Sequence, residues 1–240
     1  GKLGVIIHTS DGGQTWRIQG VNVALGVNLI GVTFSDESNG QAITARGSSI
    51  LRTRDGGETW TREFLSDTTL RSDWTFIDTM RGWMAFTSGG VLYTADGGET
   101  WERHKGVNEV DIGQTGIFFL DDSRGWIAGW RGRKTELRSG LQFSQYLTDG
   151  MVGRTTDGGV TWTRHDSRTG RFLWDVVFLD ENTGWTVGSF GTVMYSEDGG
   201  VTWKAQVSNT EQILRKVTFP DADNGWAVGD NGAILKFTAR

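Results

Sequence analysis

The segment Ser10-Asp11-Gly12-Gly13-Gln14-Thr15-Trp16 decides the fold, because close copies of it recur along the chain. The core Asp-Gly-Gly-x-Thr-Trp returns four more times, at Asp55–Trp60, Asp96–Trp101, Asp157–Trp162 and Asp198–Trp203. The successive Asp residues are 44, 41, 61 and 41 positions apart. A period of about 40–45 residues is typical of one four-stranded blade of a β-propeller. The long step is interpreted as one period that carries an insertion of about 20 residues.

A second motif, Phe-x-Asp-x-x-x-Gly-Trp, lies out of phase with the first. It occurs at Phe76–Trp83, Phe119–Trp126, Phe178–Trp185 and Phe219–Trp226. In the earliest copy, Phe34–Gln41, a glutamine replaces the tryptophan. Each unit is interpreted as four short strands: strand a ends at the Phe, strand b starts at Gly-Trp, strand c precedes the Asp box and strand d starts at its Thr-Trp.

This pattern predicts an all-β protein, a propeller of four-stranded antiparallel blades joined at the c–d turns by Asp boxes. The chain opens with strands c and d, continues through four complete units and ends with strands a, b and c, which gives 21 strands. We expect about six blade positions, with seven possible. Residues 1–240 are expected to form one propeller domain, either truncated or closed by joining the terminal strands.

The five Asp boxes are expected to be structural. Asp accepts hydrogen bonds from the backbone of its own turn, and Gly adopts positive φ without steric cost. The residues given this role are Asp11, Asp55, Asp96, Asp157 and Asp198.

Composition limits the chemistry. The 240 residues contain no Cys, so disulfides and thiolate metal sites are excluded. The net charge of −5 argues against nucleic acid and anionic membranes as partners. No apolar run reaches membrane-spanning length and no signal peptide is visible. The three His residues lack metal-ligand spacing, so no metal and no cofactor are predicted.

The segment Gly225–Leu235, together with the Asp boxes, resembles the photosystem II stability/assembly factor family of BNR/Asp-box propellers. The resemblance covers nearly the whole chain. It implies an extracytoplasmic propeller (periplasmic, lumenal or secreted) that binds another protein, as part of the assembly of a membrane complex. It implies no known catalysis.

Polar residues near the start of strand a form the first candidate site, because strand a lines the central channel of a propeller. These residues stand three to five positions before the repeat Phe, or its equivalent: Arg71, Asp73, Asp175, Arg215 and Lys216. They either form a polar binding ring or pair with each other and with water to fix the contacts between blades.

The insertion Arg131–Asp149 is the second candidate site and is expected to be a b–c loop on the same face as the channel entrance. It carries Arg131, Arg133, Lys134 and Arg138. A basic loop of this kind suits an acidic peptide or a phosphate, and the alternative is a solvated excursion without a ligand. Trp130 and Trp174 lie outside the repeat and are candidates for exposed anchors.

Two functions follow. The favoured one is a non-catalytic scaffold that docks a protein or peptide partner through the face carrying the d–a and b–c loops. The alternative is a carbohydrate-binding or glycoside hydrolase propeller, for which Asp73 and Asp175 are the carboxylate pair that such hydrolysis needs. The question of an enzyme stays open, with the scaffold favoured.

Overall fold

The computed structural model describes residues 4–19, 28–34, 36–44, 49–64, 71–86, 89–104, 113–134 and 146–238. In these residues it contains 21 strands, the number predicted from the repeat. The strands are β1 (Ile6–His8), β2 (Arg17–Gln19), β3 (Leu29–Phe34), β4 (Gly40–Thr44), β5 (Ser49–Thr53), β6 (Thr61–Phe64), β7 (Arg71–Phe76), β8 (Gly82–Phe86), β9 (Val91–Thr94), β10 (Glu102–His104), β11 (Gly113–Phe119), β12 (Gly125–Lys134), β13 (Tyr146–Thr155), β14 (Thr163–Asp166), β15 (Leu173–Phe178), β16 (Gly184–Gly188), β17 (Val193–Ser196), β18 (Lys204–Gln206), β19 (Leu214–Thr218), β20 (Asn224–Gly229) and β21 (Ile234–Thr238). Two short 3-10 turns, η3 (Ser189–Gly191) and η4 (Asp230–Gly232), join strands b and c of the last two units.

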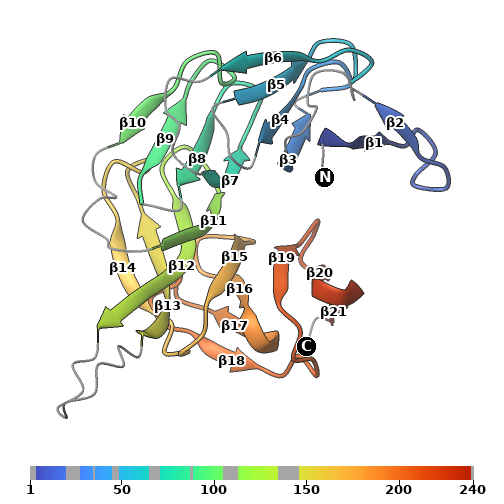
Figure 1. Ribbon diagram of the computed structural model, residues 1–240. Helices are drawn as coiled ribbons and strands as arrows, with labels where there is room; N and C mark the ends of the chain where they lie inside the picture. Colours follow the sequence, from blue (N-terminus) through green and yellow to red (C-terminus); the bar gives the residue numbers. More distant parts are fainter. Residues whose placement is uncertain are drawn as a thin grey trace, which may run out of the picture.

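The strands form antiparallel sheets arranged in an arc around a central space (Figure 1). Four sheets have the complete four strands in sequence order: β3–β6, β7–β10, β11–β14 and β15–β18. A two-stranded sheet, β1–β2, and a three-stranded sheet, β19–β21, stand at the two ends of the arc and remain separate sheets. The predicted all-β propeller is confirmed, and among the described residues the terminal strands belong to two separate sheets.

The Asp box organises each c–d turn by local hydrogen bonds. In the second copy, the backbone N–H of Thr59 donates to Oδ1 of Asp55 at 2.9 Å, and the Thr59 hydroxyl donates to Oδ2 at 2.5 Å. These hydrogen bonds, with a third from Thr53, hold the pKa of Asp55 at about 2. Gly56 and Gly57 adopt φ of 70° and 90°, which an L side chain rarely does. The Asp side chain is therefore fully engaged by its own turn.

Stacked aromatic rings join neighbouring sheets. Trp83 of β8 stacks on Phe119 of the next sheet with ring centroids 3.8 Å apart, and its Nε1 donates to the carbonyl of Gly158 at 2.8 Å. Trp126 repeats the arrangement one sheet later, stacking on Phe178 at 3.8 Å. Both indoles are fully buried, so the Gly-Trp motif forms the core between blades.

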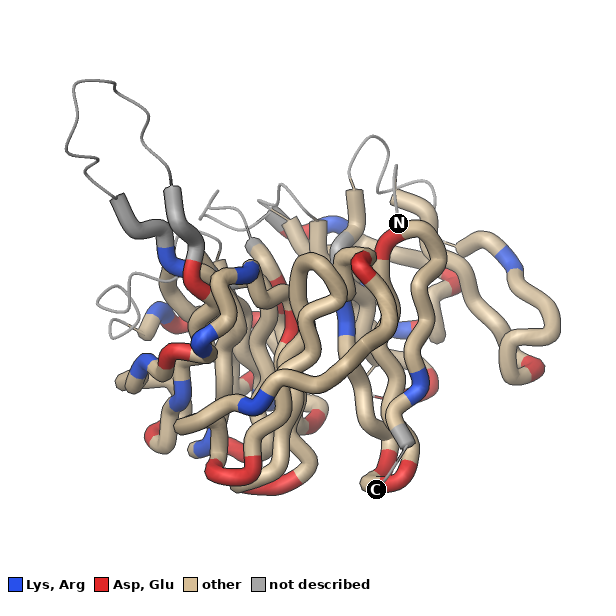
Figure 2. The backbone as a smooth tube through the Cα atoms, turned by 90° about the horizontal axis from the view of Figure 1, so that it is seen from below, with Lys and Arg blue, Asp and Glu red and all other residues tan. Residues whose placement is uncertain are grey.

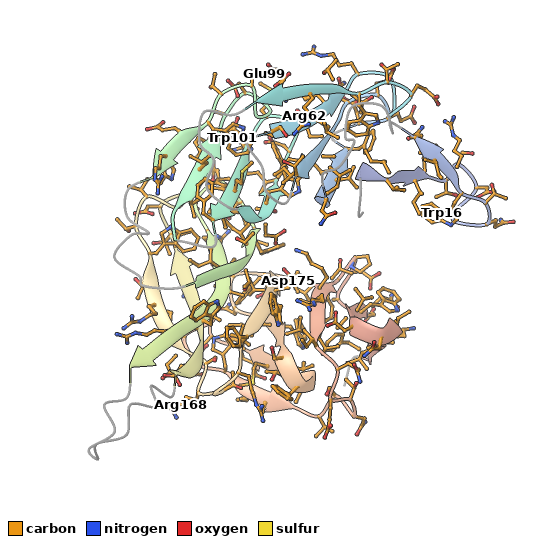
Figure 3. The ribbon with its side chains drawn as sticks, in the orientation of Figure 1. Trp16, Arg62, Glu99, Trp101, Arg168 and Asp175 are labelled. Carbon is orange, nitrogen blue, oxygen red and sulfur yellow. The ribbon has the colours of Figure 1, made fainter. Side chains whose placement is uncertain are left out.

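Trp16 differs from Trp60 and Trp203, the buried tryptophans of two other Asp boxes. Its side chain is 57% exposed, because the sheet β1–β2 has no described neighbour on that side. Figure 3 shows Trp16 at the free end of the arc.

The molecule has two faces of different character. The turn face carries the a–b turns and the Asp boxes, and acidic residues gather along it (Figure 2). The loop face carries the b–c and d–a connections, including the one that joins β12 and β13. In the described part of the chain, no helix is long and apolar enough to cross a membrane.

The insertion differs from the predicted loop. Strands β12 and β13 are ten residues each, and the ladder between them continues from Trp130–Gly150 through Arg131–Asp149 to Lys134–Tyr146. The basic residues at 131–134 therefore lie in a paired β-ribbon. Arg138 lies outside the described residues.

Candidate binding surface on the loop face

A β-bulge interrupts every complete strand a at the same place, near its loop-face end. The register shifts fall between Leu29 and Gly31, Arg71 and Asp73, Gln114 and Gly116, Leu173 and Asp175, and Leu214 and Lys216. The extra residue of a bulge leaves the ladder, and a bulge re-aims the side chains around it. Trp174 and Arg215 are two of these bulged residues, and the residue after each bulge belongs to the column predicted to line the channel.

Three of the predicted polar residues meet in one place, which we call the channel cluster: Asp73, Asp175 and Lys216. Nζ of Lys216 lies 2.7 Å from Oδ2 of Asp73 and 3.3 Å from Oδ1 of Asp175. The two carboxylates are buried, at 9% and 4% exposure, whereas the lysine side chain is 52% exposed. Figure 3 places Asp175 at the inner side of the arc. The carboxylates thus lie on either side of one ammonium group.

Each carboxylate also binds the backbone of the next sheet. The N–H of Ile117 donates to Oδ2 of Asp73 at 3.2 Å, and the N–H of Val217 donates to Oδ2 of Asp175 at 2.9 Å. Gly116 stands between them in the column, and a Cβ there would come within 2.8 Å of the Asp175 backbone. This geometry favours the alternative in which these residues fix contacts between blades. Both carboxylates of the pair Asp73 and Asp175 already accept hydrogen bonds from Lys216 and from the backbone of the next sheet.

Burial dominates the electrostatics of the channel cluster. It raises the pKa of Asp175 to about 7; the nearby Lys216 opposes this shift and Asp73 adds to it. Burial alone would lower the pKa of Lys216, but the charges of Asp175 and Asp73 raise it above its ordinary value. The lysine therefore stays charged, and Asp175 is the member that titrates near neutral pH.

A second group lies on the loop face beside the cluster. The ring of Phe172 lies 5.2 Å from that of Trp130 and 6.4 Å from that of Trp174. The guanidinium of Arg215 lies over Trp174, 4.4 Å from the ring centroid, at a distance typical of a cation–π interaction. We call Trp130, Arg171, Phe172, Trp174, Phe190 and Arg215 the aromatic–arginine surface.

Polar contacts fix the centre of this surface. The indole Nε1 of Trp174 donates to the hydroxyl of Ser189 at 3.0 Å. Arg215 donates from Nε and Nη2 to the two carboxylate oxygens of Asp230, both at 2.9 Å. This two-point ion pair raises the pKa of Arg215 and lowers that of Asp230. The ion pair thereby fixes the guanidinium of Arg215 over the ring of Trp174.

Phe190 completes the surface and was missed by the sequence reasoning. Its φ is 56°, in the left-handed region, and its ring is 64% exposed with the guanidinium of Arg171 4.3 Å above it. The equivalent turn of the next unit has Asn231 at φ 55°, a residue type that tolerates this conformation. The signal in the sequence was Gly188-Ser-Phe-Gly191 set beside Gly229-Asp-Asn-Gly232.

The remaining predicted residues are placed as follows. Arg71 pairs with Phe86 in the ladder of β7 and β8, and its side chain is outside the described part. Arg131 is half-buried in the ribbon of β12 and β13. Arg133 and Lys134 lie further along that ribbon with their side chains undescribed. Among the described residues, no three His, Asp or Glu side chains are grouped as a metal site would require.

Family models match two parts of the chain. Residues 153–238 match the model described as photosynthesis system II assembly factor YCF48, and residues 92–103 match the BNR/Asp-box repeat. The resemblance to the photosystem II assembly factor family is thereby confirmed. No curated protein matches the sequence.

Solved structures with a similar fold include YCF48 from Cyanidioschyzon merolae, at 21% identity and a TM-score of 0.56 over 99% of this chain and 89% of that one. A structure described as YCF48 bound to D1 peptide matches at 18% identity over 93% and 96% of the two chains, with a TM-score of only 0.41. The GH74 xyloglucanase from Xanthomonas campestris matches at 11% identity and a TM-score of 0.65, over 96% of this chain and 40% of that enzyme. At these identities, the first and third comparisons show a shared propeller fold alone.

Proposed function

We propose that this photosystem II assembly factor-like β-propeller binds a protein or peptide partner through the aromatic–arginine surface of its loop face. The description of the matching family as an assembly factor supports a protein partner. We extend the proposal to a partner that is part of a membrane complex, met on the extracytoplasmic side.

Phe190 carries the proposal. A bulky residue with φ of 56° stores strain, and strain of this kind persists where a function maintains it. The ring gains little from the fold itself, since 64% of it is exposed. An exposed aromatic ring with an arginine stacked on it matches the residues that dominate binding energy at protein interfaces.

The neighbouring groups define the partner's chemistry. Trp130, Phe172 and Trp174 supply rigid aromatic area, which suits apolar or aromatic side chains. Arg171 is exposed and free to turn toward a carboxylate, whereas Arg215 is already paired with Asp230. We therefore expect a peptide that combines an apolar anchor with an acidic residue.

The first test replaces Phe190→Asn, which installs the residue type found at Asn231 in the equivalent turn. This change removes the ring and relaxes the backbone, so the thermal midpoint is expected to stay or rise while partner binding weakens. Val160→Ser is the matched control, because Val160 is similarly exposed (51%) but stands on an Asp-box turn of the turn face. Retention of partners from the extracytoplasmic and membrane fractions of the source organism would be compared across the three proteins.

The ribbon gives a second test. Charge reversal at Arg131, Arg133 and Lys134 is expected to weaken partner binding without lowering stability. Unchanged binding in both this variant and Phe190→Asn would refute the proposed surface. A glycan and glycoside panel run on the same samples, beside an Asp73/Asp175 double alanine variant, tests the carbohydrate alternative: turnover lost in that variant would make this an enzyme.

A further inference from the structure

Four sheets present a strand b to the strand a of the next sheet, and one of these four interfaces lacks the stacked indole that fills the other three. In three interfaces a Gly-Trp tryptophan stacks on the strand-a Phe of the next sheet: Trp83 on Phe119, Trp126 on Phe178 and Trp185 on Phe219, at 3.8, 3.8 and 4.2 Å. In the interface between β3–β6 and β7–β10 the corresponding residue is Gln41. The glutamine is smaller than an indole and has no ring to stack.

Gln41 replaces only part of the missing indole. Its Nε2 donates to the carbonyl of Gly97, which corresponds to the Gly158 and Gly199 carbonyls that accept from Trp83 and Trp126. Its Oε1 is buried and has no hydrogen-bond partner among the described residues. The substitution thus keeps the polar contact and loses the ring.

A cavity of about 630 Å³ occupies this interface. Its lining includes Gln41, Arg52, Phe76, Asp78, Met80 and Glu99. In the described part of the chain, the aromatic contacts of Phe76 are edge-on only, with Trp74 at 5.6 Å and Trp101 at 6.1 Å. Phe119 and Phe178 have the same edge contact with their Asp-box tryptophans, at 6.0 Å, in addition to the stacked indole. The face-on partner of Phe76 is what is missing.

The charges of the cavity select among flat ligands. Asp36, Asp78, Asp96 and Glu99 line it, against Arg52 and Arg54. The guanidinium of Arg52 already donates to the carbonyls of Gly97 and Gly98 and to Glu63, so it is not available to a ligand anion. The excess of carboxylates disfavours phosphates and carboxylates and favours neutral or cationic groups.

We propose that this cavity, the Gln41 slot, binds a neutral, planar aromatic group that carries an N–H, of the size and shape of an indole. The group stacks on Phe76 as the repeat tryptophans stack on Phe119 and Phe178. A turn of the Gln41 amide then brings Oε1, which has no donor among the described residues, to the N–H of the group. The cavity volume lies in the range of small-molecule sites. The ligand is a free indole-type molecule or the tryptophan side chain of a partner, and the slot stands on the turn face, independent of the aromatic–arginine surface.

The test measures binding to the whole chain by isothermal titration calorimetry. Indole and N-acetyl-tryptophanamide represent the free molecule and the partner side chain, and indole-3-acetate is the anionic control. We expect saturable binding of at least one neutral probe, with indole-3-acetate at least about tenfold weaker. Tighter binding of the amide assigns the slot to a partner's tryptophan, and tighter binding of indole assigns it to a free molecule. No saturable binding of either neutral probe would overturn the proposal.

The variant Gln41→Trp fills the slot with the chain's own indole and is expected to lose at least about tenfold in affinity for the same probe. Val201→Ser, on an Asp-box turn of the turn face outside the cavity lining, is the matched control and is expected to lose much less. A soak of wild-type crystals with 5-bromoindole locates the probe without any variant. A bromine signal beside Phe76 supports the proposal, and a signal only elsewhere, or equal affinity in Gln41→Trp, would refute it.

Discussion

The channel cluster makes the stability of the protein depend on pH in a direction opposite to ordinary acid denaturation. Asp175 has a pKa of about 7 in the folded chain, because it is buried, against 3.8 for an unperturbed Asp. Between these two values the folded protein keeps a proton that the unfolded chain has released. The free energy of unfolding therefore falls as pH rises from about 4 to about 7, and this contribution is constant above that window.

The magnitude follows from the size of the pKa shift. One pKa unit corresponds to about 1.4 kcal/mol, so a shift of roughly three units gives a loss on the order of 4 kcal/mol across the window. The variant Asp175→Asn cannot titrate there. An amide, like the protonated carboxyl, offers one full acceptor oxygen to Lys216 and the Val217 N–H, so we expect the stability of the variant at low pH to be close to that of the wild type. Its free energy of unfolding is expected to vary much less between pH 4 and 7.

Urea denaturation at half-unit pH steps measures both curves. Asp223→Asn, which removes an exposed carboxylate from the turn face, is the control and should keep the wild-type slope. Equal slopes in the wild type and Asp175→Asn would show that Asp175 is ionised throughout the window. The reasoning from its burial would then be wrong.

Three further outcomes are expected. Trp126→Leu should lower the free energy of unfolding by about 3–5 kcal/mol, because it opens a cavity against Phe178 and leaves the Gly199 carbonyl without its donor. Urea denaturation measures this loss, and a value below about 1 kcal/mol would contradict the role of the stacked interface. Gln41→Trp should raise the thermal midpoint by burying an indole on Phe76, and a lowered midpoint in calorimetry would mean that the slot does not accept a ring. Below pH 4 stability should fall as the pH approaches the pKa of about 2 of Asp11, Asp55 and Asp96, since the folded form favours their charged state; Asp55→Asn should flatten this fall, and an unchanged fall would count against this role.

The blade pattern could be predicted from the sequence because its determinants are local. The Asp box closes its turn through atoms within four residues of one another, such as Asp55 with Thr59. Gly-Trp and the strand-a Phe recur at fixed spacing, so the number and order of strands follow from the repeat. The closure of the arc does not follow, because it depends on whether the end sheets β1–β2 and β19–β21 meet, which is a long-range contact.

The insertion was predicted as a loop, although residues 131–134 form a strand, because this strand also depends on a long-range contact. Residues 129–134, Gly-Trp-Arg-Gly-Arg-Lys, have no alternation of apolar and polar residues that would mark a strand. What makes it a strand is the register with residues 146–150 across the hairpin. Pairing between two strands of a hairpin cannot be recognised from the composition of either strand alone.

The sequence predicted that the residues of the channel cluster occupy equivalent positions in successive strands a, but it did not predict their contacts. Aligning strands on their Phe grouped Asp73, Asp175 and Lys216, but the contact of one lysine with both carboxylates depends on the curvature of the arc. The bulge in strand a also decides the direction of Trp174 and Arg215, and no residue type announces a bulge here. Phe190 was missed because the sequence shows only that its turn resembles the turn with Asn231, whereas its left-handed backbone appears in the structure.

Gln41 and Phe190 both depart from the repeat, and such departures have local effects in repeat proteins. Because each sheet packs mainly on its neighbours, a residue that departs from the repeat changes one interface and leaves the others intact. Gln41 departs where Trp is the rule, and Phe190 stands where the next unit has Asn231. In the first case the stacked ring is absent beside a cavity of about 630 Å³; in the second a strained, exposed ring is present. Both departures act against stability, so each is a place where the fold alone does not explain the residue. If Gln41→Trp and Phe190→Asn both stabilise the protein, a single substitution at either position gives a more stable chain. Stability then does not explain why Gln41 and Phe190 are present, and we infer that binding does.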